Sequence, residues 1–375
     1  MYRKTRLEIN ETYLKENLKN IICEYDDYKY IFGVVKGNCY GHGEKLIKTM
    51  LKCGINYLAV SSLEEALSVR KQTDDTPILC FGYIGPNEID VAIENNITIT
   101  ILSYDHYLEM KEIKGYKAHL KLNTGMNRVG VNKKEQVKEI KENIELEGIY
   151  THFATSGVLD VYWDKQVKKF EELTSLINLK EIEIVHLYNS LSLVKHEMNK
   201  YANGVRLGIV MYGYSSSIKE PRGIRKLAFA FRKRMRTKGI KISKVSMSNN
   251  LKLKKLFTLK SEIININEVK KGDVVGYNAI YKVTKKSRIA VIPVGHADGV
   301  TKYYKMVEIN NKLYNIVALT MDSIMVEVDN SVNVHDEVIL FGGKITLASI
   351  AQESGISVHQ ALVSIGLRIT RVYIK

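Results

Sequence analysis

The segment "FGVVKGNCYGHG", residues 32 to 43, joins an apolar run to a loop that holds three glycines and a tyrosine. The run ends at Lys36, and the ammonium group of a lysine is rarely buried. A lysine that merely ends a strand can extend its charged head to solvent, which would explain Lys36 without any function. The alternative is a lysine held at the end of a buried strand for its chemistry. The rest of the chain decides between the two.

The composition is that of an ordinary globular protein. Its 375 residues are 45% hydrophobic and 26% charged, which allows two domains with a sizeable core. No apolar run reaches the length of a membrane span, and the start, "MYRKTRLEIN", lacks the apolar segment of a secretion signal. We therefore expect a cytoplasmic protein.

The cysteines and histidines predict neither a disulfide framework nor a metal site. Cys23, Cys39, Cys53 and Cys80 are widely spaced and form no CxxC pair, which is typical of a reduced chain. The nine histidines include no HExxH pattern. We expect buried free thiols and no bound metal.

The formal net charge of +15 is concentrated in one segment. Residues 219 to 255 hold 14 Lys and Arg and a single acid, Glu220, so this segment carries +13. A solvated surface loop is the first interpretation. A tether to a membrane surface or to nucleic acid is the second, and the part "LAFAFRKRMR" would allow an amphipathic helix at a membrane surface. A nucleic-acid-binding protein would depend on this charge alone.

Eight apolar runs in the first part of the chain predict buried strands. They are continuously apolar, as strands covered on both faces are, and segments with helical spacing separate them. This alternation predicts a (β/α)8 barrel of the TIM type, although an open doubly wound sheet would also fit. The runs are residues 30–35, 56–60, 77–83, 97–103, 118–122, 146–153, 183–189 and 204–210.

The pattern changes near residue 256. Short strand-like runs such as "RIAVIPV" and "DEVILFG" alternate with turn residues, and two helical segments precede the final "LRITRVYIK". We therefore predict three parts: a barrel over residues 1–217, a basic insert over 218–255 and a mainly β domain over 256–375.

Polar residues follow the carboxyl ends of several predicted barrel strands, where the active site of such a barrel lies. Lys36, Arg128, His152, Ser190 and Arg206 follow or end the first, fifth, sixth, seventh and eighth strands. Each alone has a structural explanation, such as a helix cap or a surface charge. Their common place at one rim favours a catalytic site.

A lysine at such a rim indicates covalent attachment of pyridoxal phosphate. Partial burial lowers the pKa of a lysine, and the neutral amine is the nucleophile. The backbone N–H groups of Gly208 and Ile209 and the hydroxyls of Ser190 and Tyr40 are the candidate phosphate ligands.

These residues amount to a family resemblance that covers the chain outside residues 219 to 255. "VVKGNCYGHG" resembles the cofactor-lysine segment of alanine racemases. Six further segments resemble the family in its order: "HLKLNTGMNRVGV", "GIYTHFATS", "VRLGIVMYG", "VVGYNAIY", "IPVGHADGV" and "LTMDSIMVEV". The resemblance implies a pyridoxal-phosphate enzyme of fold-type III, a head-to-tail homodimer, and a D-amino acid product for cell-wall precursors.

The resemblance also implies roles for individual residues. Lys36 would hold the cofactor and act as one base, and Tyr277 of the opposite subunit would be the second base. His152 and Arg206 would belong to the network that activates this tyrosine. Arg206 would also face the pyridine nitrogen of the cofactor.

Three residues correspond to substrate-binding positions of the family. Arg128 would bind the phenolic oxygen of the cofactor and the substrate carboxylate, and the backbone N–H of Met321 would contact the same carboxylate. Lys121 matches a position where the lysine is often carbamylated and holds that arginine.

Two departures leave the substrate open. Leu367 aligns with a tyrosine that lies close to the cofactor phosphate and the substrate methyl group in the family. His296 stands where a tyrosine usually lines the entry. Alanine is the first choice of substrate, serine the second, as in the serine racemases of the vancomycin-resistance type, and a larger amino acid the third.

Other classes fit less well. Amino-acid decarboxylases of the same fold place an acid opposite the pyridine nitrogen, whereas this chain has Arg206 in "GVRLG". A cofactor-binding barrel without strong catalysis would lack the β domain that carries Tyr277.

Overall fold

The computed structural model describes residues 2–156, 161–196, 198–214 and 251–375. Two compact units emerge, which we call the barrel unit (Leu14–Gly37 and Glu44–Lys254) and the C-terminal unit (Met1–Tyr13, Asn38–Gly43 and Lys255–Lys375). Residues 215–250, which include most of the basic insert over 218–255, lie outside the described residues.

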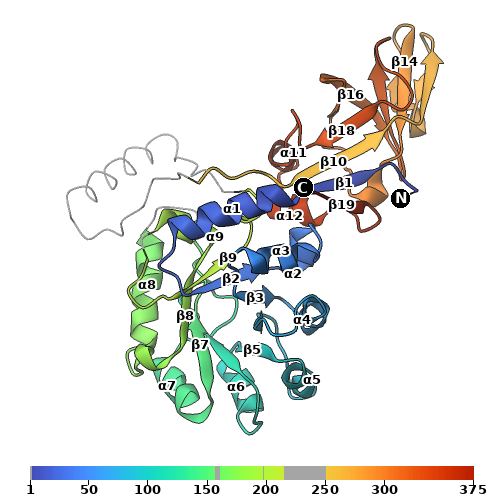
Figure 1. Ribbon diagram of the computed structural model, residues 1–375. Coiled ribbons are helices and arrows are strands. Elements are labelled where there is room, and N and C mark those ends of the chain that lie inside the picture. Colours follow the sequence, from blue (N-terminus) through green and yellow to red (C-terminus); the bar gives the residue numbers. More distant parts are fainter. Residues whose placement is uncertain (1, 157–160, 197, 215–250) are drawn as a thin grey trace, which may run out of the picture. The chain divides into compact units, whose positions relative to one another are not determined.

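The barrel unit contains a closed barrel of eight parallel strands, as predicted (Figure 1). The strands are β2 (Tyr30–Val34), β3 (Tyr57–Val60), β4 (Ile78–Cys80), β5 (Ile97–Ile101), β6 (Ala118–Lys121), β7 (Leu146–Tyr150), β8 (Ile184–Asn189) and β9 (Gly204–Leu207). Each of the eight lies within one predicted apolar run. β9 pairs with β2 and closes the ring, so the open-sheet alternative is excluded.

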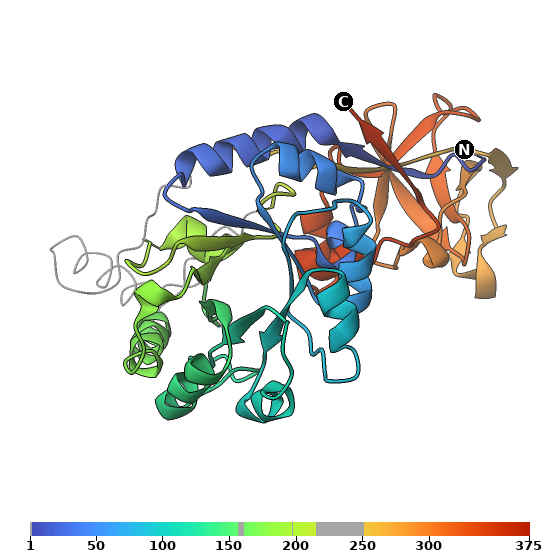
Figure 2. The same cartoon turned by 60° about the horizontal axis from the view of Figure 1, so that its bottom comes forward.

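The strands of the barrel are buried on both faces. All residues of β3, β5 and β9 are buried, one set facing the barrel interior and the other facing the surrounding helices. Figure 2 shows these helices around the outside of the ring. They are α3 (Leu46–Lys52), α4 (Leu63–Arg70), α5 (Ile89–Glu94), α6 (Tyr104–Met110), α7 (Lys134–Asn143), α8 (Val161–Leu173) and α9 (Ser190–Lys195), with α1 (Glu11–Glu24) and η1 (Leu179–Glu181) completing the unit.

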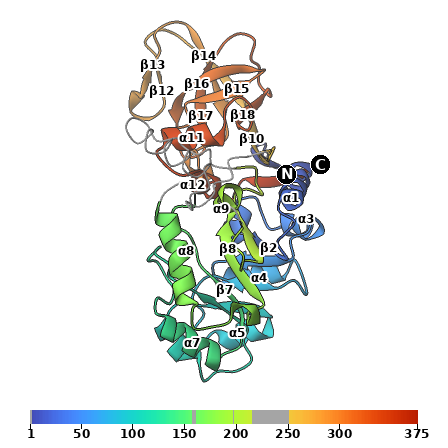
Figure 3. The same ribbon diagram turned by 90° about the vertical axis from the view of Figure 1, so that its left-hand side faces the viewer.

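The C-terminal unit is a nine-stranded sheet with a small hairpin and two helices (Figure 3). The sheet order is β11-β14-β17-β16-β15-β18-β10-β1-β19. Its strands are β1 (Arg6–Asn10), β10 (Phe257–Glu262), β11 (Asn265–Val269), β14 (Ser287–Ile292), β15 (Met306–Ile309), β16 (Lys312–Leu319), β17 (Ile324–Val328), β18 (Glu337–Phe341) and β19 (Thr370–Ile374). The hairpin is β12 (Val274–Val275) and β13 (Tyr281–Lys282), and the helical elements are η2 (Tyr277–Ala279), η3 (His296–Asp298), α11 (Leu347–Glu353) and α12 (Val358–Val363).

The sheet includes a strand from the other end of the chain. β1 pairs antiparallel with β10 and parallel with β19. Leu7 and Ile9 of β1 are fully buried, which secures the amino end of the chain in this unit.

Two negative findings hold for the described parts of the chain. None of the helices there is both long and apolar enough to cross a membrane. No cluster of His, Cys, Asp and Glu in the same residues could hold a metal ion.

Candidate active site

The barrel unit gathers eight of the predicted site residues at the carboxyl ends of its strands. They are Lys36 after β2, Lys121 at the end of β6, Arg128 in the loop beyond it, His152 after β7, Ser190 after β8, and Arg206, Gly208 and Ile209 in and after β9. The charges of Lys36, Lys121, Arg128 and Arg206 all lower the pKa of His152, so these groups share one electrostatic environment.

Lys36 carries an amine suited to nucleophilic chemistry. Its side chain is half-buried, and the amine makes no hydrogen bond to any residue that the structure describes. Burial lowers the pKa of Lys36, the neighbouring charge of Arg128 lowers it further, and Glu65 opposes both. A larger fraction of this amine is therefore neutral at physiological pH than for a free lysine.

The loop after Lys36 adopts an unusual backbone. In α2 (Lys36–Tyr40) the four residues after the lysine have φ values between 53° and 62°, so they form a left-handed turn. Such a conformation costs roughly 1–2 kcal/mol for each residue other than glycine. The carboxylate of Glu65 holds the start of the turn, because it accepts the N–H groups of Gly37 at 2.7 Å and Ser61 at 2.8 Å.

Arg206 is a buried and almost fully bonded guanidinium. Its Nη1 donates to Nδ1 of His186 at 2.8 Å and to the His186 carbonyl at 2.5 Å, and its Nη2 donates to the carbonyls of Thr151 and Leu187. Burial lowers the pKa of Arg206 to about 10, so the group is still a cation at neutral pH. Its Nε–H makes no hydrogen bond to a described residue and is left for a ligand.

Ser190 and Ile209 provide the remaining polar groups of the rim. Asn189 caps α9 by accepting two N–H groups of its first turn, which places Ser190 at the start of the helix. The Ser190 hydroxyl accepts the Gly208 N–H at 2.8 Å. Of the two predicted backbone donors, only the Ile209 N–H has no partner among the described residues.

His152 is held as a neutral imidazole. Its Nε2 lies 3.3 Å from the amide nitrogen of Asn189, whose oxygen is already used as the helix cap, so Nε2 accepts and Nδ1 carries the proton. Burial and the surrounding cations lower the pKa of His152 to about 2. The Nδ1–H has no partner among the described residues.

Lys121 is a buried lysine with no acid beside it in the described parts of the chain. The side chain is 3% exposed, Nζ lies 4.9 Å from the ring centre of Tyr150, and its one hydrogen bond, 3.4 Å long, goes to the carbonyl of Leu122. Burial and the charges of Arg206 and Arg128 lower the pKa of Lys121 well below its usual value.

Arg128 differs from the other cations of the rim. It is exposed and forms no ion pair with a described residue. A free guanidinium at the mouth of the barrel is a ready ligand for a carboxylate.

Five predicted site residues belong to the C-terminal unit, four of them in its later part. Tyr277 begins η2 and is 75% exposed, Met321 is 61% exposed, and Leu367 is 80% exposed in the turn before β19. His296 begins η3, where its Nδ1 lies 3.2 Å from the Val300 carbonyl.

Tyr40, whose hydroxyl was predicted to bind phosphate, also belongs to the C-terminal unit. Burial raises its pKa to about 12, so the phenol stays protonated. Its ring centre lies 5.9 Å from that of His359 on α12. The contact between Tyr40 and His359 was not predicted, because the six residues of α12 are too few for their spacing to show which face of the helix is buried.

Several partners of the rim were also missed. Thr151, His186 and Asn189 orient Arg206 and His152, yet each stands in an apolar run and was given no role of its own from the sequence. The available signal was a histidine inside a strand that is otherwise apolar. His119 in β6 and His186 in β8 both show it.

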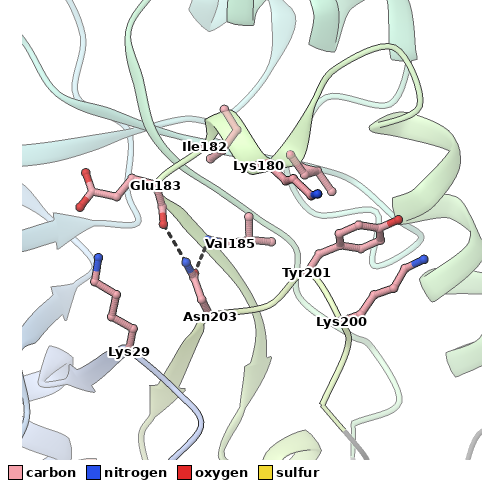
Figure 4. A pocket seen from close by; sticks show the side chains of 9 residues that line it. Lys29, Lys180, Ile182, Glu183, Val185, Lys200, Tyr201 and Asn203 are labelled. Atoms are coloured by element: carbon pink, nitrogen blue, oxygen red, sulfur yellow. Dashed lines mark hydrogen bonds between the residues drawn. The ribbon is translucent and has the colours of Figure 1, made fainter.

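A cavity of about 560 Å³ lies at the opposite end of the barrel (Figure 4). It opens beside the residues that precede β2, β8 and β9, and the amide of Asn203 bonds there to the backbone of Glu183 and Val185. Three lysines, Lys29, Lys180 and Lys200, stand on its wall. None of the predicted site residues lines this cavity.

The buried histidines predict a pH-dependent stability. Burial lowers the pKa of His42 to about 3 and that of His152 to about 2, and it also lowers the pKa of His119 and His186. An unfolded histidine takes up a proton below about pH 6.5, whereas His42 and His152 stay neutral in the folded chain at pH 5. The folded chain should therefore lose about 1.4 kcal/mol for each of these two histidines and each pH unit below 6.5.

Urea unfolding at pH 7.5, 6 and 5 measures this loss. His42→Gln should reduce this slope, because it deletes one of these two groups. A free energy of unfolding that is the same at pH 7.5 and pH 5 would contradict the neutral assignment.

Comparison with known proteins identifies the family. The alanine racemase N-terminal domain matches residues 9–216, and the alanine racemase C-terminal domain matches residues 256–373. The chain belongs to the alanine racemase family. It is therefore an amino-acid racemase, an isomerase, and members of this family depend on pyridoxal 5′-phosphate.

The relatives agree over the full chain. The alanine racemase of Clostridium kluyveri is 30% identical over 398 residues, which covers 100% of this chain and 95% of the relative. The alanine racemase of Halalkalibacterium halodurans is 31% identical over 399 residues and covers 100% and 96%. The predicted family and the predicted fold class are thus confirmed.

Solved structures give the same result. The alanine racemase from Bacillus anthracis with bound L-Ala-P has a TM-score of 0.84 and 30% identity, and it covers 100% of this chain and 96% of that chain. A histidine racemase from Leuconostoc mesenteroides subsp. sake has a TM-score of 0.83 and 25% identity, with 100% and 99% covered.

The rim fits the cofactor of the family. Lys36 offers an amine with a lowered pKa and no competing hydrogen bond from the residues that the structure describes. The Nε–H of Arg206 and the N–H of Ile209 have no partner among the described residues. Gly208, which precedes Ile209, donates to the Ser190 hydroxyl and so joins the two loops. A covalent anchor, a donor for a ring nitrogen and donors for a phosphate are the groups that pyridoxal phosphate requires.

Proposed function

We propose that this racemase interconverts L- and D-alanine with two bases, Lys36 and Tyr277. The observation that carries the proposal is the amine of Lys36. It is half-buried, has a lowered pKa and lies at the same rim as the bonded Arg206 and the free Arg128.

The rim residues would hold the cofactor from several sides. Lys36 would bind it covalently, Ser190, Ile209 and Tyr40 would bind its phosphate, and Gly208 would support the Ser190 hydroxyl. When bound, pyridoxal phosphate supplies an electron sink that stabilises negative charge at the substrate Cα.

Lys36 and Tyr277 would move the Cα proton on opposite faces of the substrate. One base removes the proton of one enantiomer, and the other returns a proton from the far side. Tyr277 would come from a second copy of the chain, and its 75% exposure within this chain leaves its hydroxyl available to such a partner. The free Nδ1–H of His152 would donate to the phenolate oxygen and so favour the basic form of the tyrosine.

Arg206 would set the electronic character of the site. A guanidinium at neutral pH donates a hydrogen bond but does not give up its proton. The pyridine nitrogen that it faces would therefore stay largely unprotonated, and the weaker electron sink would favour quick return of the Cα proton. A decarboxylase would require an acid at this place.

Arg128 and the Met321 N–H would bind the substrate carboxylate. Arg128 is free of ion pairs, which leaves its guanidinium fork for a carboxylate or for the phenolic oxygen of the cofactor.

Lys121 would carry a carbamate. The lowered pKa of its buried amine favours the neutral form, which can react with CO₂, and the resulting negative charge would lie beside Arg206 and Arg128, which have no acid partner among the described residues. We expect ¹³C-labelled bicarbonate to give one protein-bound carbamate signal in ¹³C NMR, and Lys121→Gln to lose it. Lys117→Gln, an exposed lysine before β6, should keep the signal. A spectrum without that signal in the unaltered chain would contradict this role.

Alanine is the proposed substrate, and serine or a larger amino acid is the alternative. The histidine racemase among the structural relatives shows that this architecture also occurs in an enzyme named for a larger amino acid. Leu367 and His296 remain the proposed specificity positions, Leu367 for the space near the substrate side chain and His296 for the entry.

The function is tested by racemisation in heavy water with pyridoxal phosphate. L-alanine, L-serine and L-histidine are offered separately, and inversion and Cα deuteration are followed. We expect L-alanine to invert with the highest kcat/KM. Faster inversion of serine or histidine would replace the proposed substrate, and no exchange on any of the three would overturn the proposal.

The wider role follows from the same reaction. We propose a cytoplasmic homodimer that supplies a D-amino acid for cell-wall precursors. For the basic insert we keep the solvated-loop interpretation, with contact to a membrane surface as the alternative and no nucleic-acid partner.

A further inference from the structure

A continuous chain of hydrogen bonds runs through the interior of the barrel behind Arg206. Nη1 of Arg206 lies 2.8 Å from Nδ1 of His186, Nε2 of His186 lies 2.9 Å from Nδ1 of His119, and Nε2 of His119 lies 3.2 Å from Oε2 of Glu147. The four residues come from β9, β8, β6 and β7. Arg206 lies toward the carboxyl ends of the strands and Glu147 toward their amino ends.

The direction of every hydrogen bond in this chain is determined by its two ends. A guanidinium only donates, so Nδ1 of His186 must accept and its proton must be on Nε2. That proton is donated to Nδ1 of His119, whose own proton must then be on Nε2 and points to Glu147. Both histidines are thereby neutral Nε2–H tautomers. A protonated His119 would direct a second N–H at His186 and break the pattern.

The Glu147 end of the chain is an ionised carboxylate. Burial raises the pKa of Glu147, but hydrogen bonds from His119, Tyr57 and Thr98 outweigh this effect and bring the pKa to about 2. Tyr57 donates to Oε2 at 2.7 Å and Thr98 donates to it at 3.0 Å. The row of hydrogen bonds therefore ends at a fixed acceptor, the Glu147 carboxylate, and at a fixed donor, the Arg206 guanidinium.

The packing leaves the two imidazoles little freedom. His186 lies between the rings of Phe32 and Tyr150, with centroid distances of 4.6 and 4.5 Å and interplanar angles of 16° and 18°. Gly148 adjoins His119 so closely that a Cβ there would be 2.6 Å from the ring. Neither ring can turn to exchange its nitrogens without displacing these neighbours.

We propose that His119 and Glu147 are positioning residues that hold His186 as a hydrogen-bond acceptor and so fix the guanidinium of Arg206. Without the carboxylate, His119 could adopt the other tautomer and donate to His186, which would then present an N–H to Arg206. Two donors would face each other, and Arg206 would move from its place at the rim. The consequence for catalysis rests on the proposed function, whereas the tautomer assignment does not.

The first test examines the histidine rings in the full chain without added cofactor. Long-range ¹H–¹⁵N NMR of deuterated, ¹⁵N-histidine-labelled protein at neutral pH should show the Nε2–H tautomer for His119 and His186. His119→Gln assigns one of the two signals. In Glu147→Gln, which preserves the shape of the side chain, we expect both signals to change to mixed tautomers. An Nδ1–H tautomer of His186 in the unaltered protein would overturn the proposal even if the variant failed to fold.

The second test uses the enzyme with pyridoxal phosphate. Glu147→Gln should bind the cofactor, lower kcat for racemisation about tenfold with little change in KM, and raise the yield of pyridoxamine phosphate per turnover. Glu183→Gln is the matched control. Glu183 is an exposed carboxylate at the same end of the barrel, and it accepts a hydrogen bond from the Tyr30 hydroxyl at 2.5 Å instead of belonging to the hydrogen-bond chain from Arg206 to Glu147. It should leave the kcat and side-product yield unchanged.

The outcomes separate the two proposals. Unchanged histidine tautomers and an unchanged kcat in Glu147→Gln would overturn the positioning role while the racemase stands. An unaltered enzyme that fails to racemise, with the predicted tautomers and their change in Glu147→Gln, would overturn the proposed function but support the positioning of Arg206.

Discussion

Replacement of Lys36 by alanine should lower racemisation by roughly 10⁴-fold or more, the order of loss expected when a covalent anchor is removed. The amine has two roles in the proposed mechanism, the attachment of the cofactor and the transfer of the Cα proton. No other described lysine can take over, because Lys121 is directed onto Tyr150 and Leu122 in the barrel interior. The loss should therefore not be rescued by excess cofactor.

Borohydride reduction followed by mass spectrometry measures the attachment directly. The unaltered chain should retain one cofactor mass on the peptide that contains Lys36, and Lys36→Ala should retain none. Lys117→Ala is the control, since Lys117 is exposed and lies before β6 at the amino end of the barrel. A Lys36→Ala enzyme that kept more than a few per cent of its activity would contradict the assignment.

The barrel was predictable because its strands are buried on both faces. Strands buried on both faces are mostly apolar along their length, so each shows as a largely continuous run, and β4 is an example with Ile78, Leu79 and Cys80 all buried. The end of each run then marks the rim. For this reason Lys36 and Arg206 were placed on the correct side of the barrel by sequence alone.

The pairing of β1 was not predictable in the same way. Its partners, β10 and β19, begin at residues 257 and 370, and nothing local in "RLEIN" indicates them. Strand pairing is decided by long-range packing, here by Leu7 and Ile9 entering the core of the C-terminal unit. For the same reason, the sequence could not indicate that the first residues, which we predicted as part of the barrel, belong to the C-terminal unit.

The left-handed turn after Lys36 was hidden for a different reason. The glycine and asparagine that open it tolerate positive φ, but the cysteine and tyrosine that follow do not favour it. Local propensity therefore predicted an irregular loop. The contacts that compensate for the strain, such as the Glu65 carboxylate on the Gly37 N–H, come from a helix that begins 27 residues after Lys36.

The chain from Arg206 to Glu147 shows the limit of motif reasoning. A histidine in a buried strand is most often a satisfied core residue, and His119 and His186 are indeed fully bonded. Their importance lies in the order of the hydrogen bonds, which depends on residues from four neighbouring strands. No spacing along the sequence encodes that order.

Tyr277→Phe should lower kcat/KM for racemisation by roughly 10³-fold, because one of the two proton-transfer groups is lost. The two enantiomers have equal free energies, so the equilibrium constant is one and kcat/KM must fall equally in both directions. The difference between the faces can appear only in proton exchange. In heavy water, the enantiomer that gives its proton to Lys36 should still become deuterated at Cα with retention of configuration, whereas the other should exchange far more slowly.

Tyr281→Phe provides the matched control within the same unit. Tyr281 lies four residues further along, and its hydroxyl donates to Glu327 at 2.7 Å, so its loss removes a phenol and a hydrogen bond but no proposed base. It should lower the thermal stability slightly and leave both exchange rates equal to those of the unaltered enzyme. If Tyr277→Phe instead exchanged the Cα protons of both enantiomers at equal rates, a single group would have to reach both faces of the substrate. Lys36 is the one base that could then do so, and the second base would have to be abandoned.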